Sequence, residues 1–241
     1  SLKIPCKMSL YLIILIVVIV GPLALSFEKN LMLCKRWKYL LPGIFISMLI
    51  FGVWDIIFTH IGCWQFNPTY NSGIYFFKLP LEEYLFFIAI PYACAFSYYA
   101  IKFHFPNYIL GDKATTIISS VLFIGSLTLA FTNMERTYTF VNFSFLALTV
   151  LLTYKYSRTV LQRYLAIFPI LLIPFFIVNG ILTGFGIDQE VFSYDQKYII
   201  GVYLFTMPLE DMFYAFSLLI SVIAFTEILE KRFSKTISQA K

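Results

Sequence analysis

The sequence predicts an all-α integral membrane protein with seven transmembrane helices, built from two parallel three-helix repeats that a fourth helix joins. The first observation is composition: of 241 residues, 60% are hydrophobic and only 13% are charged, and the mean hydropathy is +0.81. Soluble domains are about 45–50% apolar. The second observation is a set of long apolar runs, and the third is an internal repeat.

Each predicted helix is an apolar run near the roughly 20 residues that cross a bilayer core, bounded by charged or turn residues. The seven runs lie at residues 8–26, 39–59, 79–103, 116–132, 137–154, 164–183 and 206–225. Basic loops follow the first, third and fifth runs, and a basic tail follows the seventh. These segments hold thirteen of the 18 Lys and Arg residues. Because basic residues favour the cytoplasmic side, we expect a cell-membrane protein with its C-terminus cytoplasmic and its N-terminus outside.

One polar motif occurs twice. GIYFFKLPLEE at residues 73–83 aligns without gaps with GVYLFTMPLED at residues 201–211, an offset of 128 residues. Upstream, VWDIIFT matches IVNGILT, which places Asp55 opposite Asn179. The offset spans four helices, an even number, so matching helices point the same way and a pseudo-twofold axis along the membrane normal relates the repeats. We therefore expect units at 1–103 and 137–241, joined by a linking helix within 104–136.

The repeated motif places two adjacent acids at the start of an apolar run: Glu82 and Glu83 in one copy, Glu210 and Asp211 in the other. Proline followed by acid is an ordinary helix start. However, an ionisable group within a membrane helix costs about 2.5 kcal/mol or more and usually marks function. Adjacent helical residues project about 100° apart, so one acid of each pair can face a central cavity while the other faces a neighbouring helix. Desolvation and like charge oppose ionisation, so such a pair can donate a proton.

Aromatic residues make up 20% of the chain. Phe and Tyr are common in membrane helices and at their ends, but rings beside the acids can also stabilise a cation through their π faces. The candidates for substrate binding are Tyr75, Phe86, Tyr203 and Tyr214. Acids, a dry cavity and aromatic walls together favour acid-initiated carbocation chemistry on a lipophilic alkene.

The doubled Pro-Leu-Glu-acid motif, with Trp-Asp before the first copy and Asn-Gly-Ile-Leu-Thr before the second, closely resembles the membrane-integral lycopene cyclase family in its fused form. The resemblance covers nearly the whole chain. It implies conversion of lycopene, drawn from the bilayer, through γ-carotene to β-carotene without net redox change.

The resemblance also implies roles for individual residues. It assigns acid and base catalysis to Glu82, Glu83, Glu210 and Asp211, of which Glu82 and Glu210 are favoured by their place in the motif. Asp55 and Asn179 are expected to hold or orient those carboxyls. Trp54 and Trp64 are expected to form cavity walls.

Other function classes lack their motifs. Gly184 and Gly186 do not complete a G-x-G-x-x-G dinucleotide turn, and no lysine lies within 206–225 to form a retinal Schiff base. There is no aspartate-rich diphosphate site, and His60 and His104 lie at opposite ends of two helices. We therefore predict no cofactor and no metal. The net charge of +5 fits the anionic inner leaflet, and nothing else suggests nucleic acid.

Two alternatives remain at this point. One is a related enzyme acting on a carotenoid end group, either a one-end cyclase that makes γ-carotene or a hydratase in which water captures the same cation. The other is a non-enzymatic, proton-coupled lipid carrier, which would need a polar pathway through the helices.

Overall fold

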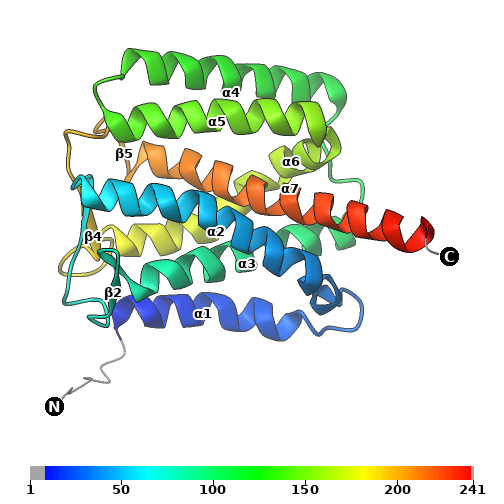
Figure 1. The fold of residues 1–241 in the computed structure, drawn as a ribbon, viewed down its shortest axis with the longest axis horizontal. Coiled ribbons are helices and arrows are strands. Elements are labelled where there is room, and N and C mark those ends of the chain that lie inside the picture. Colours follow the sequence, from blue (N-terminus) through cyan, green and yellow to red (C-terminus); the bar gives the residue numbers. More distant parts are fainter. Residues whose placement is uncertain (1–8, 240–241) are drawn as a thin grey trace.

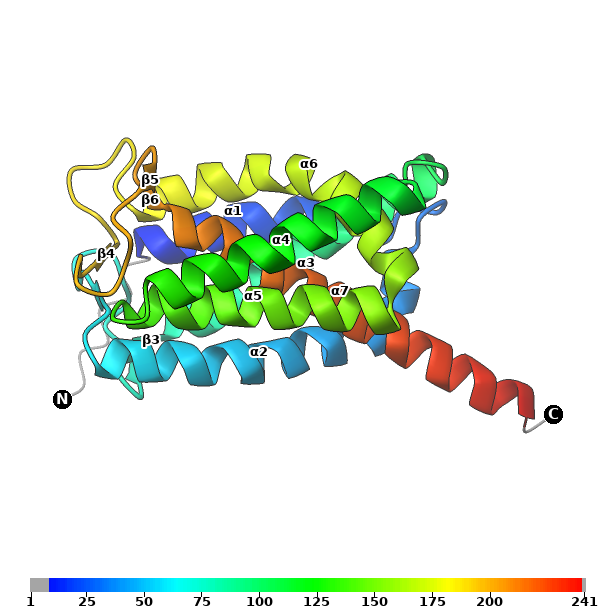
Figure 2. The same ribbon diagram turned by 90° about the horizontal axis from the view of Figure 1, so that it is seen from above.

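The computed structural model describes residues 9–239 and has a bundle of seven α-helices with short hairpins gathered at one end (Figures 1 and 2). Met8, where the first helix was expected to begin, lies outside the described residues. The helices are α1 Leu10–Leu25, α2 Trp37–His60, α3 Leu81–His104, α4 Asp112–Thr132, α5 Thr137–Tyr156, α6 Arg158–Leu182 and α7 Leu209–Gln239. A short 3-10 turn, Leu33–Arg36, leads into α2.

The helices from α2 to α7 are each long and apolar enough to cross a membrane. Helix α1 has 16 described residues and is shorter than the roughly 20 that span a bilayer core at 1.5 Å per residue. The prediction of an all-helical, multi-pass membrane protein is therefore confirmed at this level.

The loops contain strands that the sequence analysis did not predict. They are β1 Trp64–Phe66, β2 Tyr75–Phe76, β3 Leu79–Pro80, β4 Phe192–Tyr194, β5 Tyr203–Leu204 and β6 Met207–Pro208. Hairpins β2–β3 and β5–β6 occupy the two copies of the repeated motif. The third and seventh helices consequently begin at Leu81 and Leu209, a few residues later than expected, because the chain reverses direction in a tight turn just before each helix. In the first turn Phe77 and Lys78 both have positive φ, the backbone form that a two-residue hairpin favours.

Several helix contacts recur when α1–α3 are exchanged with α5–α7, although α5 packs on α6 more than α1 packs on α2. Helix α1 packs on α3 as α5 packs on α7, and α2 packs on α7 as α6 packs on α3. Helix α4 has no counterpart in this exchange and lies on the outside of the bundle against α5 and α6 (Figures 1 and 2). The core of the protein is therefore the contact between the two sets of three helices.

The two halves also meet through strands β1 and β4. They pair antiparallel, with Trp64 opposite Tyr194 and Phe66 opposite Phe192. The offset of 128 relates Trp64 to Phe192 and Phe66 to Tyr194, so exchange of the halves returns the same pairing. Two flanking backbone hydrogen bonds exchange in the same way: Asn67 N to Val191 O at 2.8 Å and Asp195 N to Cys63 O at 2.9 Å. The strand pair joins the two halves at the end of the bundle where the hairpins lie.

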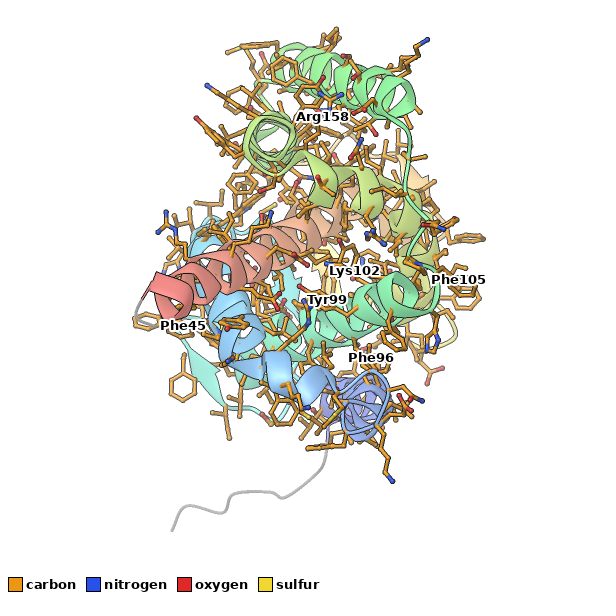
Figure 3. All side chains as sticks on the ribbon, turned by 90° about the vertical axis from the view of Figure 1, so that its right-hand side faces the viewer. Phe45, Phe96, Tyr99, Lys102, Phe105 and Arg158 are labelled. Atoms are coloured by element: carbon orange, nitrogen blue, oxygen red, sulfur yellow. The ribbon has the colours of Figure 1, made fainter. Side chains whose placement is uncertain are left out.

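At the other end of the bundle, ion pairs connect α7 to α2 and α3 (Figure 3 views this end, with Tyr99 and Lys102 labelled). Arg36 contacts Glu230 at 2.7 Å, and Lys102 contacts Glu227 at 2.5 Å. Both cations also lie over the Tyr99 ring, at 4.9 and 5.5 Å from its centroid. These contacts fasten the end of the bundle that lies away from the acidic motifs.

Candidate active site

The four acids of the repeated motif lie in the first turns of α3 and α7, next to the hairpins. Glu82, Glu210 and Asp211 are at most 4% exposed, and Glu83 is half-buried. Within each pair the two carboxyls point in different directions, as adjacent positions on a helix require.

Glu82 holds the preceding loop against α1. Its Oε1 accepts hydrogen bonds from Ser9 Oγ and from Ser72 N, both at 2.6 Å. Its Oε2 accepts one from Ser72 Oγ at 3.2 Å. The Glu82 carboxyl therefore holds the loop at Ser72 and the start of α1 at Ser9, and it does not face a cavity.

Glu210 makes the corresponding contacts in the second half. Its Oε1 accepts hydrogen bonds from Thr139 Oγ1 at 2.6 Å and from Ile200 N at 2.7 Å. Ile200 is 128 residues after Ser72, so the same backbone contact occurs twice. Glu210 Oε2 has no partner among the described residues, so the second half leaves one carboxylate oxygen unused.

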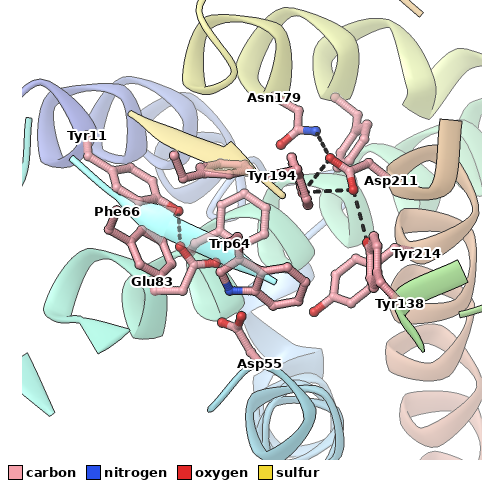
Figure 4. A pocket seen from close by; sticks show the side chains of 13 residues that line it. Tyr11, Asp55, Trp64, Phe66, Glu83, Tyr138, Asn179, Tyr194, Asp211 and Tyr214 are labelled. Carbon is pink, nitrogen blue, oxygen red and sulfur yellow. Dashed lines mark hydrogen bonds between the residues drawn. The ribbon is translucent and has the colours of Figure 1, made fainter. Parts of the chain in front are cut away.

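Glu83 and Asp211 instead face one cavity of about 50 Å³ between the two halves (Figure 4). Their carboxyls lie on opposite sides of it in this view. The walls are mostly aromatic, with Trp64, Phe66, Phe86, Phe175, Phe192 and Tyr214 among the lining residues. The site thus places one carboxyl from each half at a small, mostly aromatic cavity.

Asp211 is surrounded by hydrogen-bond donors. Tyr138 OH donates to Oδ1 at 3.0 Å, and Asn179 Nδ2 donates to Oδ2 at 2.9 Å. Tyr194 OH lies 2.9 and 2.8 Å from the two oxygens and donates to them. Hydrogen bonds to an ionised acceptor are stronger than neutral ones, so the surroundings of Asp211 suit a carboxylate.

The first half offers its acids fewer donors. Tyr11 OH donates to Glu83 Oε2 at 2.7 Å. Asp55 also lines the cavity and is 5% exposed, but its Oδ2 has no hydrogen-bond partner within the described part of the chain. On this side Tyr11 is the one hydroxyl directed at either carboxyl among the described residues, and it donates to Glu83, whereas Asp55 has the Trp64 indole N–H as its neighbouring donor.

Apart from Glu82 and Glu210, which hold the loops, the residues predicted from sequence fall into three positions. Those that line the cavity are Asp55, Trp64, Glu83, Phe86, Asn179, Asp211 and Tyr214. Trp54 lies behind the wall, 5.3 Å from the Tyr214 ring. Tyr75 and Tyr203 lie away from the cavity: they belong to the hairpin strands β2 and β5 and are 41% and 39% exposed. Closeness in sequence to the acids was misleading for these two, because the hairpin turns them outward before the helix begins.

Three tyrosines of the site were not predicted: Tyr11, Tyr138 and Tyr194. Tyr11 and Tyr138 lie in the first turns of α1 and α5. A buried tyrosine hydroxyl usually has a hydrogen-bond partner, which was the one signal that could have indicated them. Their spacing from the acids does not repeat, so alignment of the two halves could not reveal them. Tyr194 aligns with Phe66, and only the pairing of β1 with β4 brings it to Asp211.

Chemically, this arrangement can donate a proton from one side and accept one on the other. The cavity is small and its walls are mostly aromatic, which suits an apolar molecule placed between the two carboxyls. The ring faces can stabilise a positive charge that forms between the carboxyls.

Comparison with known families gives one match. A family model described as lycopene cyclase matches residues 8–101 and 135–229. The two matched segments cover more than half of the chain, and each contains one acid pair. No curated protein and no solved structure matches the chain.

Proposed function

Because this chain belongs to the lycopene cyclase family, we propose that it is a lycopene β-cyclase that converts lycopene through γ-carotene to β-carotene. The observation that carries the proposal is the placement of Glu83 and Asp211, one from each half, around a single aromatic cavity. The reaction is an isomerisation, so it needs no oxidant or reductant.

The proposed reaction begins and ends with proton transfer. A carboxylic acid adds a proton to the terminal double bond, and the neighbouring alkene attacks the tertiary cation to close a six-membered ring. A carboxylate then removes a ring proton to leave the β-ionone double bond. We assign these steps to Glu83 and Asp211, in place of the initial preference for Glu82 and Glu210, whose carboxyls hold the loops.

We propose that the polyene beyond the reacting end lies in a second, larger space. An apolar groove of about 490 Å³ runs beside α6 and the β5–β6 hairpin. Helix α6 presents Phe175 and Asn179 to the cavity and Ile177 and Gly180 to the groove. Ile177 is 60% exposed and Phe205 at the hairpin tip is 86% exposed, which suits contact with lipid and with a lipophilic substrate that arrives from the bilayer.

We further propose the arrangement of the chain in the membrane. The two matched segments correspond to parallel three-helix units, residues 1–103 and 137–241, joined by 104–136. All seven helices cross the bilayer in this proposal, with the acids near the outer face and the C-terminus cytoplasmic. The support is the repeated packing of the helices and the distribution of basic residues.

Pigment analysis in a lycopene-accumulating bacterial host tests the function. β-Carotene is expected from the wild type and unchanged lycopene from a Glu83→Gln, Asp211→Asn double variant present at the same level. γ-Carotene alone would indicate a one-end cyclase, and a hydroxylated linear product would indicate a hydratase. Unchanged lycopene from well-expressed wild-type protein would contradict a cyclase and favour a carrier.

A further inference from the structure

The two halves of the cavity differ in charge at matching positions. In the second half Asn179 on α6 faces Asp211 on α7, whereas in the first half Asp55 on α2 accompanies Glu83 on α3. An amide in one half is therefore a second carboxyl in the other. The two halves match in the positions of these residues, but the first half has two carboxyls at the cavity and the second has one.

In the second half three donors that line the cavity are directed at one carboxyl. Asp211 accepts hydrogen bonds from Asn179, Tyr138 and Tyr194. Donors that point at a carboxyl favour its charged form. Asp211 is thus prepared to receive a proton.

In the first half the carboxyls at the cavity outnumber the hydroxyl donors directed at them. The structure gives Glu83 one hydroxyl donor, from Tyr11 at 2.7 Å, and leaves Asp55 Oδ2 without any in the described chain. Both carboxyls face a space of about 50 Å³. Ionising both would place two like charges in one small, mostly aromatic cavity, so the pair is expected to retain one proton.

We propose that Glu83 is the acid of the reaction, that Asp55 is a positioning residue that keeps the pair protonated, and that Asp211 is the base. This assignment rests on the cyclase function proposed above. The Glu83 O–H bond breaks as a C–H bond forms on the terminal alkene, and after the ring C–C bond forms, a ring C–H bond breaks as Asp211 gains the proton. Water admitted to the cavity returns the proton from Asp211 to the first pair, which completes the balance.

Deuterium labelling separates the two roles. Purified protein in lipid vesicles is given lycopene in D₂O, and the recovered pigments are analysed by mass spectrometry. Wild type is expected to give cyclic product with one deuterium per ring. Glu83→Gln is expected to return unlabelled lycopene, because no proton is delivered. Asp211→Asn is expected to return labelled lycopene or a labelled hydroxylated product. In this variant the cation still forms, but the carboxylate that removes the ring proton is missing.

Asp55→Asn tests the positioning role with a readout that mere packing would not change. The variant gives Glu83 an amide neighbour, as Asp211 has, so the ionised form of Glu83 is favoured. The pH above which cyclisation declines is expected to move at least one unit lower than in wild type, as a tenfold change in the protonation equilibrium would require.

Three results would overturn the assignment. They are deuterium in the pigment recovered from Glu83→Gln, unlabelled lycopene from Asp211→Asn, and an unchanged pH profile of cyclisation for Asp55→Asn. A wild type that gives no cyclic product would overturn the cyclase function itself. The two failures are thus distinguishable.

Discussion

Asn179 donates a hydrogen bond from Nδ2 to Oδ2 of Asp211 at 2.9 Å, and both side chains are buried. At the matching position in the other half stands Asp55, whose Oδ2 finds no partner among the described residues. The two halves of the cavity therefore differ at this matching position by an amide in place of a carboxyl.

Asn179→Asp should impair cyclisation. The change removes an amide donor and adds a second carboxyl beside Asp211. A hydrogen bond to a charged group contributes about 1.5–3 kcal/mol, so the rate in vesicles should fall at least about tenfold. Asn107→Asp, in the exposed loop between α3 and α4, is the matched control and should keep the wild-type rate. A wild-type rate for Asn179→Asp would contradict the role given to this amide.

Glu82→Gln should affect stability more than chemistry. A glutamine keeps one acceptor oxygen for Ser9 Oγ and Ser72 N, and it places an NH₂ where Ser72 Oγ donates. With this one hydrogen bond disturbed, the free energy of unfolding should fall by about 1 kcal/mol, measured as a lower Tm in detergent. The neighbouring Glu83→Gln should keep the wild-type Tm. If Glu82→Gln instead retains its Tm and loses all activity, the acid of the reaction is Glu82.

Gly43→Val should weaken the contact between α2 and α7. A Cβ at Gly43 would lie 2.6 Å from Thr226 Oγ1 and 3.2 Å from Val222 O, so the Thr226 side chain or the α7 backbone must shift. Overpacking of this kind costs about 1–3 kcal/mol. Gly52→Val is the control on the same helix, because nothing lies within 4 Å of its Cβ position. Equal Tm values for the two variants would show that α2 and α7 do not pack closely at Gly43.

Ile177→Trp should obstruct the groove beside α6. Ile177 lines the groove and is 60% exposed, whereas Ile173, one turn earlier, is 62% exposed and lies outside the groove lining. A misfit in an apolar site costs about 1–3 kcal/mol, so cyclisation by Ile177→Trp should fall at least about tenfold. Ile173→Trp should retain activity. Equal activity in both variants would exclude the groove as the polyene site.

Tyr194 should contribute to alkaline loss of stability. Burial, and then the charge of Asp211, raises the pKa of the Tyr194 phenol above its ordinary value. An unfolded phenol ionises near pH 10, so above about pH 10 unfolding releases a proton and stability falls as pH rises. Tyr194→Phe lacks this group, and its Tm should decline less steeply from about pH 8 to about pH 11. An identical slope would show that Tyr194 does not titrate on unfolding.

Much of the fold was predictable because membrane helices have a strong local signal. Apolar runs of about 20 residues located all seven helices to within a few residues at most ends. Two ends differ more: α6 begins at Arg158, six residues before the expected run, and α7 continues to Gln239, beyond the apolar run. The hairpins were also missed, because strands of two or three residues carry no periodicity to detect.

The sequence by itself determined that four carboxyls stand in two matching pairs at the starts of membrane helices, since the motif repeats at a fixed offset. It did not determine which of each pair faces the cavity, because both positions are acidic and their directions depend on what packs beside them. The tertiary structure decided this by directing Ser9 and Thr139 to Glu82 and Glu210, which left Glu83 and Asp211 to the central space. It also brought Tyr11, Tyr138 and Tyr194 to those acids from distant segments, and so distributed the hydrogen-bond donors unequally between the two halves.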